Sequence, residues 1–335
     1  MAVMVTGGAG YIGSHTCVEL LQAGYDVVVV DNFDNSYPEI LRRVEEITGR
    51  KLFREAGDVR DRIFLEQVLK RHKCDAVMHF AGLKSVTEST QKPLHYYDCN
   101  VVGTIRLLEA MRAVDVKRIV FSSSATVYGE PEQLPFTEDH RLLPANTYGR
   151  SKLVVEDILR DIYRGNPSWQ IAILRYFNPV GAHESGLIGE NPKGVPNNLM
   201  PLIAQVVSGK REKLTIWGND YPTHDGTGVR DYIHVEDVAK GHVRALKMLD
   251  EPQCLTLNLG TGQGYSVFEV IRAYEKVTGK SVPYEIAQRR AGDIAEYYAD
   301  PARAKEILNW SAQKTLNDMC QDMWNWQCKN PNGYQ

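Results

Sequence analysis

Short runs of β-branched apolar residues alternate with longer amphipathic segments through the first half of the chain. That order is typical of βαβ units built on a parallel sheet. We predict strands at residues 3–6, 27–30, 51–54, 76–80, 119–122 and 171–174, with helices between them. The pattern therefore predicts an α/β fold with a doubly wound parallel sheet of the Rossmann type.

One segment, residues 94–111, shows helical periodicity with particular clarity. Its apolar residues recur at intervals of three or four positions: Leu94, Tyr97, Val101, Ile105, Leu108 and Met111. This spacing predicts one helix whose apolar face packs on the core or on a second copy of the chain.

The texture of the sequence changes after Phe177. Residues 178–198 contain four glycines and three prolines, and the elements that follow are shorter. We predict two domains, residues 1–177 and residues 178–335, the second a smaller α/β lobe that caps the sheet. Part of the second lobe, such as residues 235–249, is expected to pack back on the first.

Composition excludes several classes of partner. With 39 basic and 42 acidic residues the net charge is −3, which gives no reason to expect a nucleic acid or a membrane surface as partner. The six cysteines are scattered and form no C-x-x-C pair, which favours free thiols in a reducing compartment over a disulfide framework. No signal segment precedes the first predicted strand, and no run of about 18 apolar residues could span a bilayer. We expect a cytoplasmic protein.

Histidine spacing gives no indication of a metal site. The nine histidines form neither H-x-x-x-H nor H-E-x-x-H, so no metal is predicted. His79 stands at the end of a predicted strand, where a hydrogen-bonded core histidine is the expected role.

A glycine-rich turn follows the first predicted strand and opens a helix. Gly8, Gly10 and Gly13 fit G-x-G-x-x-G, and Gly7 with the last two fits G-x-x-G-x-x-G. Such glycines let backbone amides approach a diphosphate at a helix N-terminus. Asp31 closes the second strand at the spacing expected for a carboxylate that binds the adenosine ribose.

The residues around Asp31 favour NAD over NADP. A 2′-phosphate would be repelled by the carboxylate, and no arginine or lysine occurs among the neighbours Asn32, Phe33, Asp34, Asn35 and Ser36. Asp58 and the segment Phe80, Ala81 and Gly82 follow later strands, at the sheet edge where doubly wound folds bind ligands.

A serine, a tyrosine and a lysine form the candidate chemical group. Ser124 comes at the end of the fifth predicted strand, two residues after Ser122, and Tyr148 and Lys152 lie four residues apart on one face of the next helix. Lowering the pKa of a tyrosine by about three units takes about 4 kcal/mol. One cation at about 6 Å supplies roughly 3 kcal/mol at an effective dielectric of about 20, and burial opposes it. Lys152 alone is therefore insufficient, and oxidised NAD would provide the second positive charge.

Longer segments resemble the UDP-glucose 4-epimerase family of the extended short-chain dehydrogenase/reductase superfamily. The resemblance covers essentially the whole chain and is carried by TGGAGYIGSHT (6–16), HFAGLK (79–84), FSSSATVYG (121–129), LRYFNPVGA (174–182) and GTGVRDYIHV (226–235). It implies that Tyr148 is the base, that Lys152 tunes it, and that Ser124 assists.

The resemblance also implies the binding residues. Those that contact NAD would be Gly7, Gly10, Tyr11, Ile12, Gly13, Asp31, Asn32, Phe33, Asp34, Asn35, Ser36, Asp58, Val59, Phe80, Ala81, Gly82, Leu83, Lys84, Asn100, Ser122, Tyr148, Lys152 and Phe177. Those that hold the UDP-sugar would be Ser124, Asn178, Asn197, Asn198, Leu199, Thr215, Trp217, Arg230, Arg290, Asp293 and Tyr297. Cys99 replaces an asparagine of some members, so the cofactor contact is assigned to Asn100.

The implied activity is the interconversion of UDP-glucose and UDP-galactose by a homodimer. A 4,6-dehydratase would need an acid and a base where this chain has Ala125 and Thr126. An epimerase of N-acetylhexosamine or hexuronic acid nucleotides stays open, as does a non-catalytic NAD sensor. A sensor would have no need of Ser124, Tyr148 and Lys152 together, so the presence of all three favours an enzyme.

Overall fold

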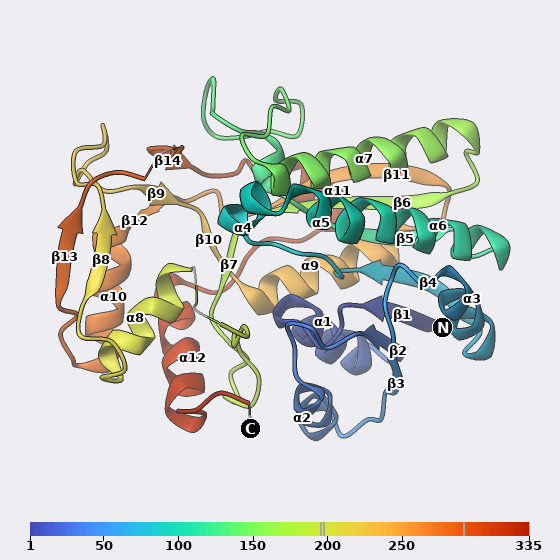
Figure 1. The fold of residues 1–335 in the computed structure, drawn as a ribbon, viewed down its shortest axis with the longest axis horizontal. Helices are drawn as coiled ribbons and strands as arrows, with labels where there is room; N and C mark the ends of the chain where they lie inside the picture. Colours follow the sequence, from blue (N-terminus) through green and yellow to red (C-terminus); the bar gives the residue numbers. More distant parts are fainter. Residues whose placement is uncertain (195, 197, 291, 335) are drawn as a thin grey trace.

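A seven-stranded sheet forms the centre of the molecule, which the computed structural model describes over residues 1–194, 196, 198–290 and 292–334. Its strands follow the order β11-β6-β5-β4-β1-β2-β3, and all neighbours are parallel (Figure 1). They are β1 (Ala2–Thr6), β2 (Asp26–Asp31), β3 (Phe53–Ala56), β4 (Cys74–His79), β5 (Arg118–Ser124), β6 (Gln170–Tyr176) and β11 (Gln253–Leu259). The predicted fold class is confirmed. The strand order reverses between β1 and β4, which is where such sheets bind ligands.

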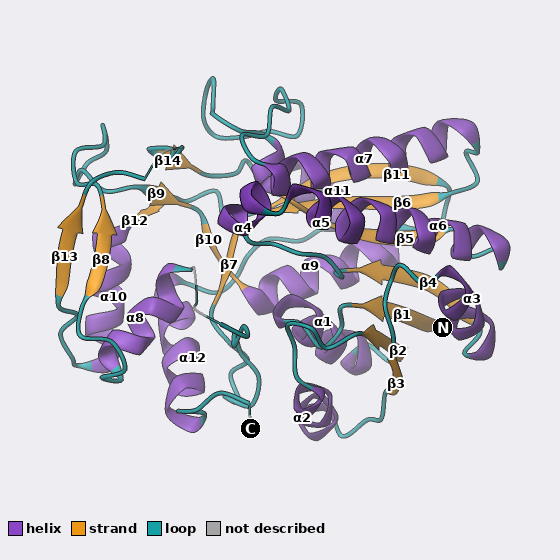
Figure 2. Ribbon diagram, viewed as in Figure 1, coloured by secondary structure: helices purple, strands orange, loops and turns teal. Residues whose placement is uncertain are grey.

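Helices cover both faces of this sheet, which explains its near-continuous apolar strands (Figure 2). Alternate residues face opposite cores: Val3 and Val5 belong to one and Met4 to the other. The first core includes α1, α2 and α9, and the second includes α3, α6 and α7. These helices are α1 (Tyr11–Gln22), α2 (Pro38–Thr48), α3 (Arg62–Arg71), α6 (Gly103–Ala113), α7 (Thr147–Gly165) and α9 (Val235–Met248).

A smaller region lies beyond the carboxyl ends of the central strands (Figure 1). In the described part of the chain its strands pair as β7 (Asn178–Val180) with β10 (Tyr232–His234), β8 (Leu214–Trp217) with β13 (Tyr284–Ala287), and β9 (Val229–Arg230) with β12 (Tyr265–Ser266) and β14 (Glu296–Tyr297). Its helices are α8 (Leu199–Val207), α10 (Val267–Thr278), α11 (Ala302–Leu308) and α12 (Leu316–Lys329). The region therefore stands next to the ligand-binding edge of the sheet.

The later part of the chain also contributes to the central layer. β11 is absent from the predicted strands, yet it pairs with β6 along its whole length. α9 covers most of the segment expected to pack back and lies against α1. Among the described residues, no helix combines the length and apolar character that crossing a membrane requires.

The single helix predicted over residues 94–111 is wrong in detail. The chain forms α5 (Pro93–Tyr96), a π-helical segment η1 (Tyr97–Val102) and then α6. The wider π turn directs Asn100 at the loop after β4, as described below, and such turns often occur at functional sites. Leu94, the first residue of the predicted apolar face, is 83% exposed.

Candidate active site

The turn between β1 and α1 has a backbone that requires glycine. Gly7 has φ of +70°, and a Cβ atom there would lie 2.7 Å from the amide nitrogen of Ala81. At Gly13 a Cβ atom would collide with the carbonyl oxygen of Gly7. α1 begins after Gly10, and within the described residues no side chain caps its amino end. The turn can therefore present bare amides to a diphosphate, as predicted from the motif.

Asp31 is held rigidly beside this turn. Its Oδ2 accepts a hydrogen bond from the amide of Ala9 (3.0 Å), and its Oδ1 accepts from the amide of Phe33 (2.9 Å) and the hydroxyl of Ser36 (2.8 Å). A carboxylate has about four lone-pair sites, so about one is left for a ribose hydroxyl. The residues present fit the adenosine end of a dinucleotide.

The loop after Asp31 has a basic neighbour that the sequence did not indicate. Lys193, which lies far along the chain, donates from Nζ to the carbonyl oxygen of Phe33 at 2.6 Å. Its backbone amide donates to Oδ1 of Asn35 at 2.9 Å. Asn32 binds Asp34 and Asp58 through its side-chain amide. The loop thus joins the central sheet to the segment that precedes α8.

Asp58 and Val59 follow β3 on the same edge of the sheet. Arg60 pairs with Asp58 at 2.8 Å and lowers the pKa of that carboxyl to about 2. Val59 is buried, and a Cβ atom at Gly103 would lie 2.9 Å from its side chain. Asp58 is therefore ionised at neutral pH and able to accept hydrogen bonds.

The segment from Phe80 to Lys84 follows β4 and is clamped by Asn100. The side chain of Asn100 accepts a hydrogen bond from the amide of Leu83 (2.7 Å) and donates to the carbonyl of the same residue (3.0 Å). It also donates to the hydroxyl of Ser151 on α7 (3.0 Å). A Cβ atom at Gly82 would lie 3.8 Å from Nζ of Lys152. Asn100 therefore positions this loop instead of merely lining it.

Ser124, Tyr148 and Lys152 converge at the carboxyl end of β5. Asn146 caps α7 by accepting from the amide of Gly149 (2.8 Å), which fixes the helix that carries Tyr148 and Lys152. Lys152 is buried, and its Nζ donates to the carbonyl of Ser122 at 2.8 Å. Burial lowers the pKa of Lys152 to about 8.

The phenol of Tyr148 has opposing influences on its pKa. Burial dominates and raises the pKa, while a hydrogen bond with Ser124 and the positive charge of Lys84 lower it. Lys84 thus joins Ser124 as a neighbour that favours the phenolate. The sequence assigned Lys84 to the cofactor loop and did not indicate this relation to Tyr148.

Phe177 and Tyr297 form an apolar wall next to the candidate chemical group of Ser124, Tyr148 and Lys152. Tyr297 is 9% exposed, and its ring lies 5.5 Å from that of Phe177 and 4.7 Å from that of Phe136. Its hydroxyl donates to the carbonyl of Ala125, next to Ser124. Tyr297 is therefore a fixed wall close to the chemical group.

Other predicted substrate residues gather in the smaller region. The guanidinium of Arg290 lies 5.9 Å from the ring of Trp217 and pairs with Asp293 at 2.9 Å. Arg230 donates to the carbonyl of Ala295 at 3.4 Å. An indole, two guanidinium groups and a carboxylate near one another can bind a nucleotide base and its phosphates. Thr215 lies on β8, two residues before Trp217, and its hydroxyl donates to Glu285.

Two further segments carry the remaining predicted contacts. The side chain of Asn178 donates to the carbonyl of Asp231 at 3.1 Å. Asn198 immediately precedes α8, whose first residue is Leu199; within the described residues its side chain does not cap the helix, and its side-chain amide donates to Glu190 at 2.8 Å. Asn197 lies outside the described residues. Glu190 was missed by the sequence reasoning, because it stands in a loop without a motif.

His79 is a core histidine. Its ring bonds the hydroxyls of Thr6 (2.7 Å) and Thr104 (2.8 Å), and burial lowers its pKa to about 3. This confirms its predicted structural role. Within the described residues, His, Cys, Asp and Glu side chains form no group of three or more that could hold a metal ion.

Comparison with known proteins identifies the family. A model described as GDP-mannose 4,6 dehydratase matches residues 4–323, so the chain is an extended short-chain dehydrogenase/reductase. UDP-glucose 4-epimerase of Bacillus subtilis is 58% identical over 100% of this chain and 99% of its own length. The chain belongs to the UDP-glucose 4-epimerase family.

Solved structures agree with this assignment. The UDP-glucose 4-epimerase of Bifidobacterium longum, in complex with NAD+ and UDP, is 55% identical with a TM-score of 0.97 and full coverage of both chains. The UDP-Glc/GlcNAc 4-epimerase of Campylobacter jejuni is 37% identical with a TM-score of 0.86, over 98% of this chain and 99% of that one. Enzymes of this fold therefore differ in the sugars named for them.

Proposed function

We propose that the protein interconverts UDP-glucose and UDP-galactose through a transient 4-keto sugar, with NAD as its cofactor. The observation that carries the proposal is the convergence of Ser124, Tyr148 and Lys152 beside the glycine turn. Residues 1–177 would bind NAD and residues 178–335 the UDP-sugar, with β11 and α9 packing back on the sheet.

The residues act on the proton and hold the reactants. The glycine turn and Asp31 would hold NAD, which when bound would supply the group that accepts and later returns a hydride. Tyr148 takes the proton of the 4-hydroxyl as the C4–H bond breaks, which leaves a ketone at C4. Ser124 hydrogen-bonds the reacting oxygen, and Lys152 stabilises the phenolate. After the hexose turns over, Tyr148 returns the proton as C4 regains hydride on its other face.

Retention of the ketone requires a firm hold on the nucleotide and a loose hold on the hexose. Arg230, Arg290 and Asp293 would bind the UDP portion, with Thr215, Trp217, Asn178, Asn197, Asn198 and Leu199. Binding energy from this non-reacting portion keeps the intermediate in place while the sugar rotates.

A 4,6-dehydratase is disfavoured although the matching family model has that description. Elimination of water needs an additional acid and base beside the sugar. Ala125 and Thr126, in the short turn η2 (Ala125–Val127) after Ser124, offer no ionisable group. An epimerase of another UDP-sugar remains the closest alternative.

Internal recycling of the hydride predicts that the purified protein carries NAD and needs none added. Denaturing the protein should release nicotinamide nucleotide, and incubation with UDP-galactose alone should yield UDP-glucose. Chromatography of the supernatant and of the sugar nucleotides measures both. Strict dependence on added NADP, or no product from UDP-galactose, would contradict the proposal.

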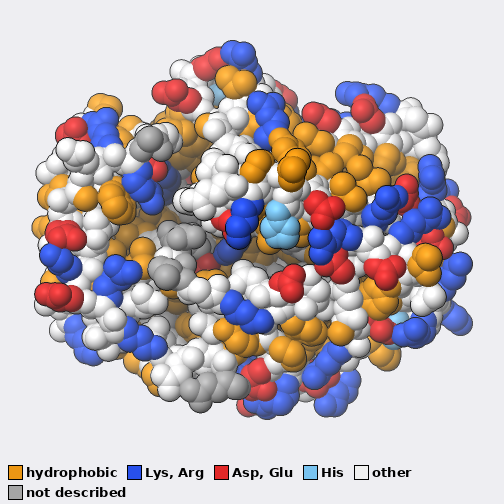
Figure 3. All heavy atoms as spheres, viewed as in Figure 1, with side chains coloured by type: hydrophobic (Ala, Val, Ile, Leu, Met, Phe, Trp, Pro, Cys, Tyr) orange, Lys and Arg blue, Asp and Glu red, His pale blue; other side chains and the backbone are white. Residues whose placement is uncertain are grey.

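The active form is proposed to be a cytoplasmic homodimer. Apolar side chains gather over the region of α5 and α7 (Figure 3), and the exposed ones include Leu94 at 83% and Val102 at 36%. An exposed apolar face of this kind is typical of a subunit interface. The second copy of the chain would cover it.

Replacing Leu94 and Val102 together by glutamate should weaken the dimer at least about tenfold, which corresponds to about 1.4 kcal/mol. Two charges would have to be buried at the interface. Sedimentation over a range of concentrations measures the dissociation constant. Ile63→Glu on α3, another exposed apolar residue, is the control and should have no effect. A wild-type protein that is monomeric throughout would refute this interface.

A further inference from the structure

Glu190 is a buried carboxylate that lies between the loop after β4, which carries Lys84, and the residues at the start of α8. Its side chain is 4% exposed. One oxygen, Oε1, accepts hydrogen bonds from Nζ of Lys84 at 3.0 Å and from the side-chain amide of Asn198 at 2.8 Å. Lys84 belongs to the loop after β4, and Asn198 immediately precedes α8. One atom therefore connects two parts of the predicted active site.

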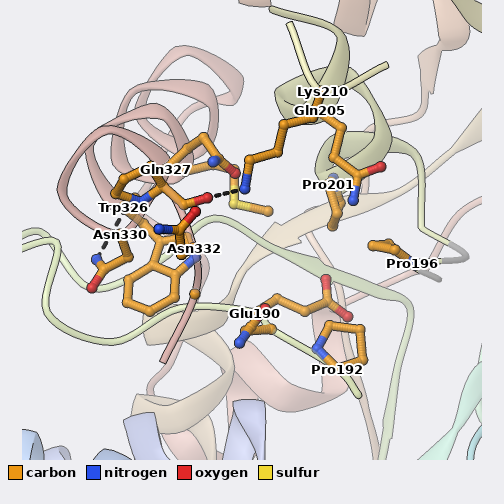
Figure 4. A pocket seen from close by; sticks show the side chains of 14 residues that line it. Glu190, Pro192, Pro196, Pro201, Gln205, Lys210, Trp326, Gln327, Asn330 and Asn332 are labelled. Carbon is orange, nitrogen blue, oxygen red and sulfur yellow. Dashed lines mark hydrogen bonds between the residues drawn. The ribbon is translucent and has the colours of Figure 1, made fainter. Parts of the chain in front are cut away.

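The other oxygen of Glu190 has no partner within the described residues. Glu190 borders a cavity of about 110 Å³ whose wall also includes Pro192, Lys210 and Trp326. Figure 4 shows the carboxylate next to the ring of Pro192. A buried carboxylate with one unpaired oxygen is costly, so the two bonds of Oε1 must hold it in place.

Lys84 is the part of this arrangement that reaches the chemistry. Its side chain is 52% exposed, and without a partner a long ammonium side chain would extend into solvent. The loop that carries it is fixed by Asn100, and Gly82 of that loop lies beside the ammonium of Lys152. The ion pair with Glu190 therefore determines where the ammonium of Lys84 stands.

We infer that Glu190 is a positioning residue for the base: it holds the ammonium of Lys84 beside the phenol of Tyr148 and couples that position to Asn198 at the start of α8. Binding of a UDP-sugar at Asn198 and Leu199 would then be communicated to the base through one carboxylate. Glu190 itself touches neither reactant.

The electrostatic surroundings agree with this role. The groups that face Tyr148 are Lys84 from the loop after β4, Ser124 from β5 and Tyr176 from β6. Lys152, on the same helix as Tyr148, directs its Nζ to the carbonyl of Ser122. The groups that face Glu190 are Lys84, Asn198 and Tyr11. Lys84 lowers the pKa of Tyr148, and Glu190 is the main cause that raises the pKa of Lys84.

Glu190→Gln keeps the shape of the side chain and removes the charge that retains Lys84. As Lys84 moves into solvent, the pKa of Tyr148 should rise. The rate falls as pH falls through that pKa, so the acid limb of the kcat profile should move to higher pH. At pH values on the acid side of the profile we expect kcat to fall by about three- to tenfold, which corresponds to a rise of about half to one unit in the pKa of Tyr148. Lys84→Met should shift the limb in the same direction.

A double-mutant cycle separates this role from a structural one. The variant that carries both changes should have the profile of Lys84→Met alone, because Glu190 acts through Lys84. Glu66→Gln, which breaks the ion pair of Glu66 with Arg62 on α3, is the matched control and should change nothing. The inference would be overturned if the acid limb of Glu190→Gln did not move or moved to lower pH. It would also be overturned if the losses in kcat of the two single variants added in the double variant.

Because this role depends on the proposed function, in which Tyr148 is the base, a second readout avoids turnover. The ultraviolet absorbance of tyrosinate, taken as the difference between the protein and its Tyr148→Phe variant, titrates this phenol directly. The same difference in the Glu190→Gln background should titrate at higher pH. If UDP-galactose is not a substrate but the titration moves, the proposed function fails and the inference stands. If epimerisation occurs and the titration does not move, the inference fails alone.

Discussion

Tyr148→Phe is expected to lower kcat by roughly two to four orders of magnitude, the usual contribution of a general acid–base group. The change removes one hydroxyl and leaves the ring on α7 in place. In the structure that hydroxyl interacts with Ser124, and Lys84 places a positive charge near it. Both groups lower the pKa of Tyr148 and so favour the phenolate, whereas burial raises the pKa. Single-turnover and steady-state rates with UDP-galactose measure the loss.

Tyr176→Phe is the matched control for Tyr148→Phe. Tyr176 is also buried, and its hydroxyl bonds that of Ser122. Its loss removes a phenol hydroxyl from the same neighbourhood without removing the proposed base. The control should retain kcat within about tenfold, and both variants should bind NAD and UDP. If Tyr148→Phe ran at the rate of the control, the base would have to be another residue.

The central sheet and the glycine turn could be predicted because their causes are local in the sequence. β2 reads DVVVVD, and such a run is expected only where both faces of a strand are covered. Gly7 and Gly13 are fixed by the close approach of backbone atoms, so the motif and the geometry coincide. Parallel strands end at one edge of the sheet, which brought Asp31 and Ser124 to the same side.

Features that depend on distant contacts were not predictable. β11 joins the sheet only because β6 offers an unpaired edge, and residues 253–259 carry no motif. The π turn at 97–102 conflicts with a regular helical period and is explained by the bonds of Asn100 to Leu83. Glu190 meets Lys84, and Lys193 meets Phe33, across more than a hundred residues of sequence. In each case the partner, rather than the residue type, defines the role.

The second large effect that we predict concerns sugar specificity, which we expect Tyr297 to determine. The resemblance to the epimerase family implies that this residue would face the substituent at C2 of the hexose, where a small residue would accompany acceptance of N-acetyl sugars. The structure gives the ring little freedom, because it packs on Phe136 and Phe177 and its hydroxyl bonds Ala125. A well-packed wall yields at a cost of roughly 1 to 3 kcal/mol, or about 10- to 200-fold in kcat/KM.

We therefore expect the protein to use UDP-glucose and UDP-galactose well and UDP-N-acetylglucosamine poorly, and Tyr297→Ser to admit the N-acetyl sugar. Values of kcat/KM for both classes of sugar, before and after the change, measure the effect. Tyr297→Phe keeps the ring and should leave the discrimination unchanged, whereas Phe136→Leu loosens the same cluster without shortening the wall. If Phe136→Leu admits the N-acetyl sugar as readily as Tyr297→Ser does, the packing of the whole cluster sets the limit. If the unmodified protein uses both classes of sugar equally, Tyr297 does not select between them, and its buried ring serves to join β14 to the turn after β5.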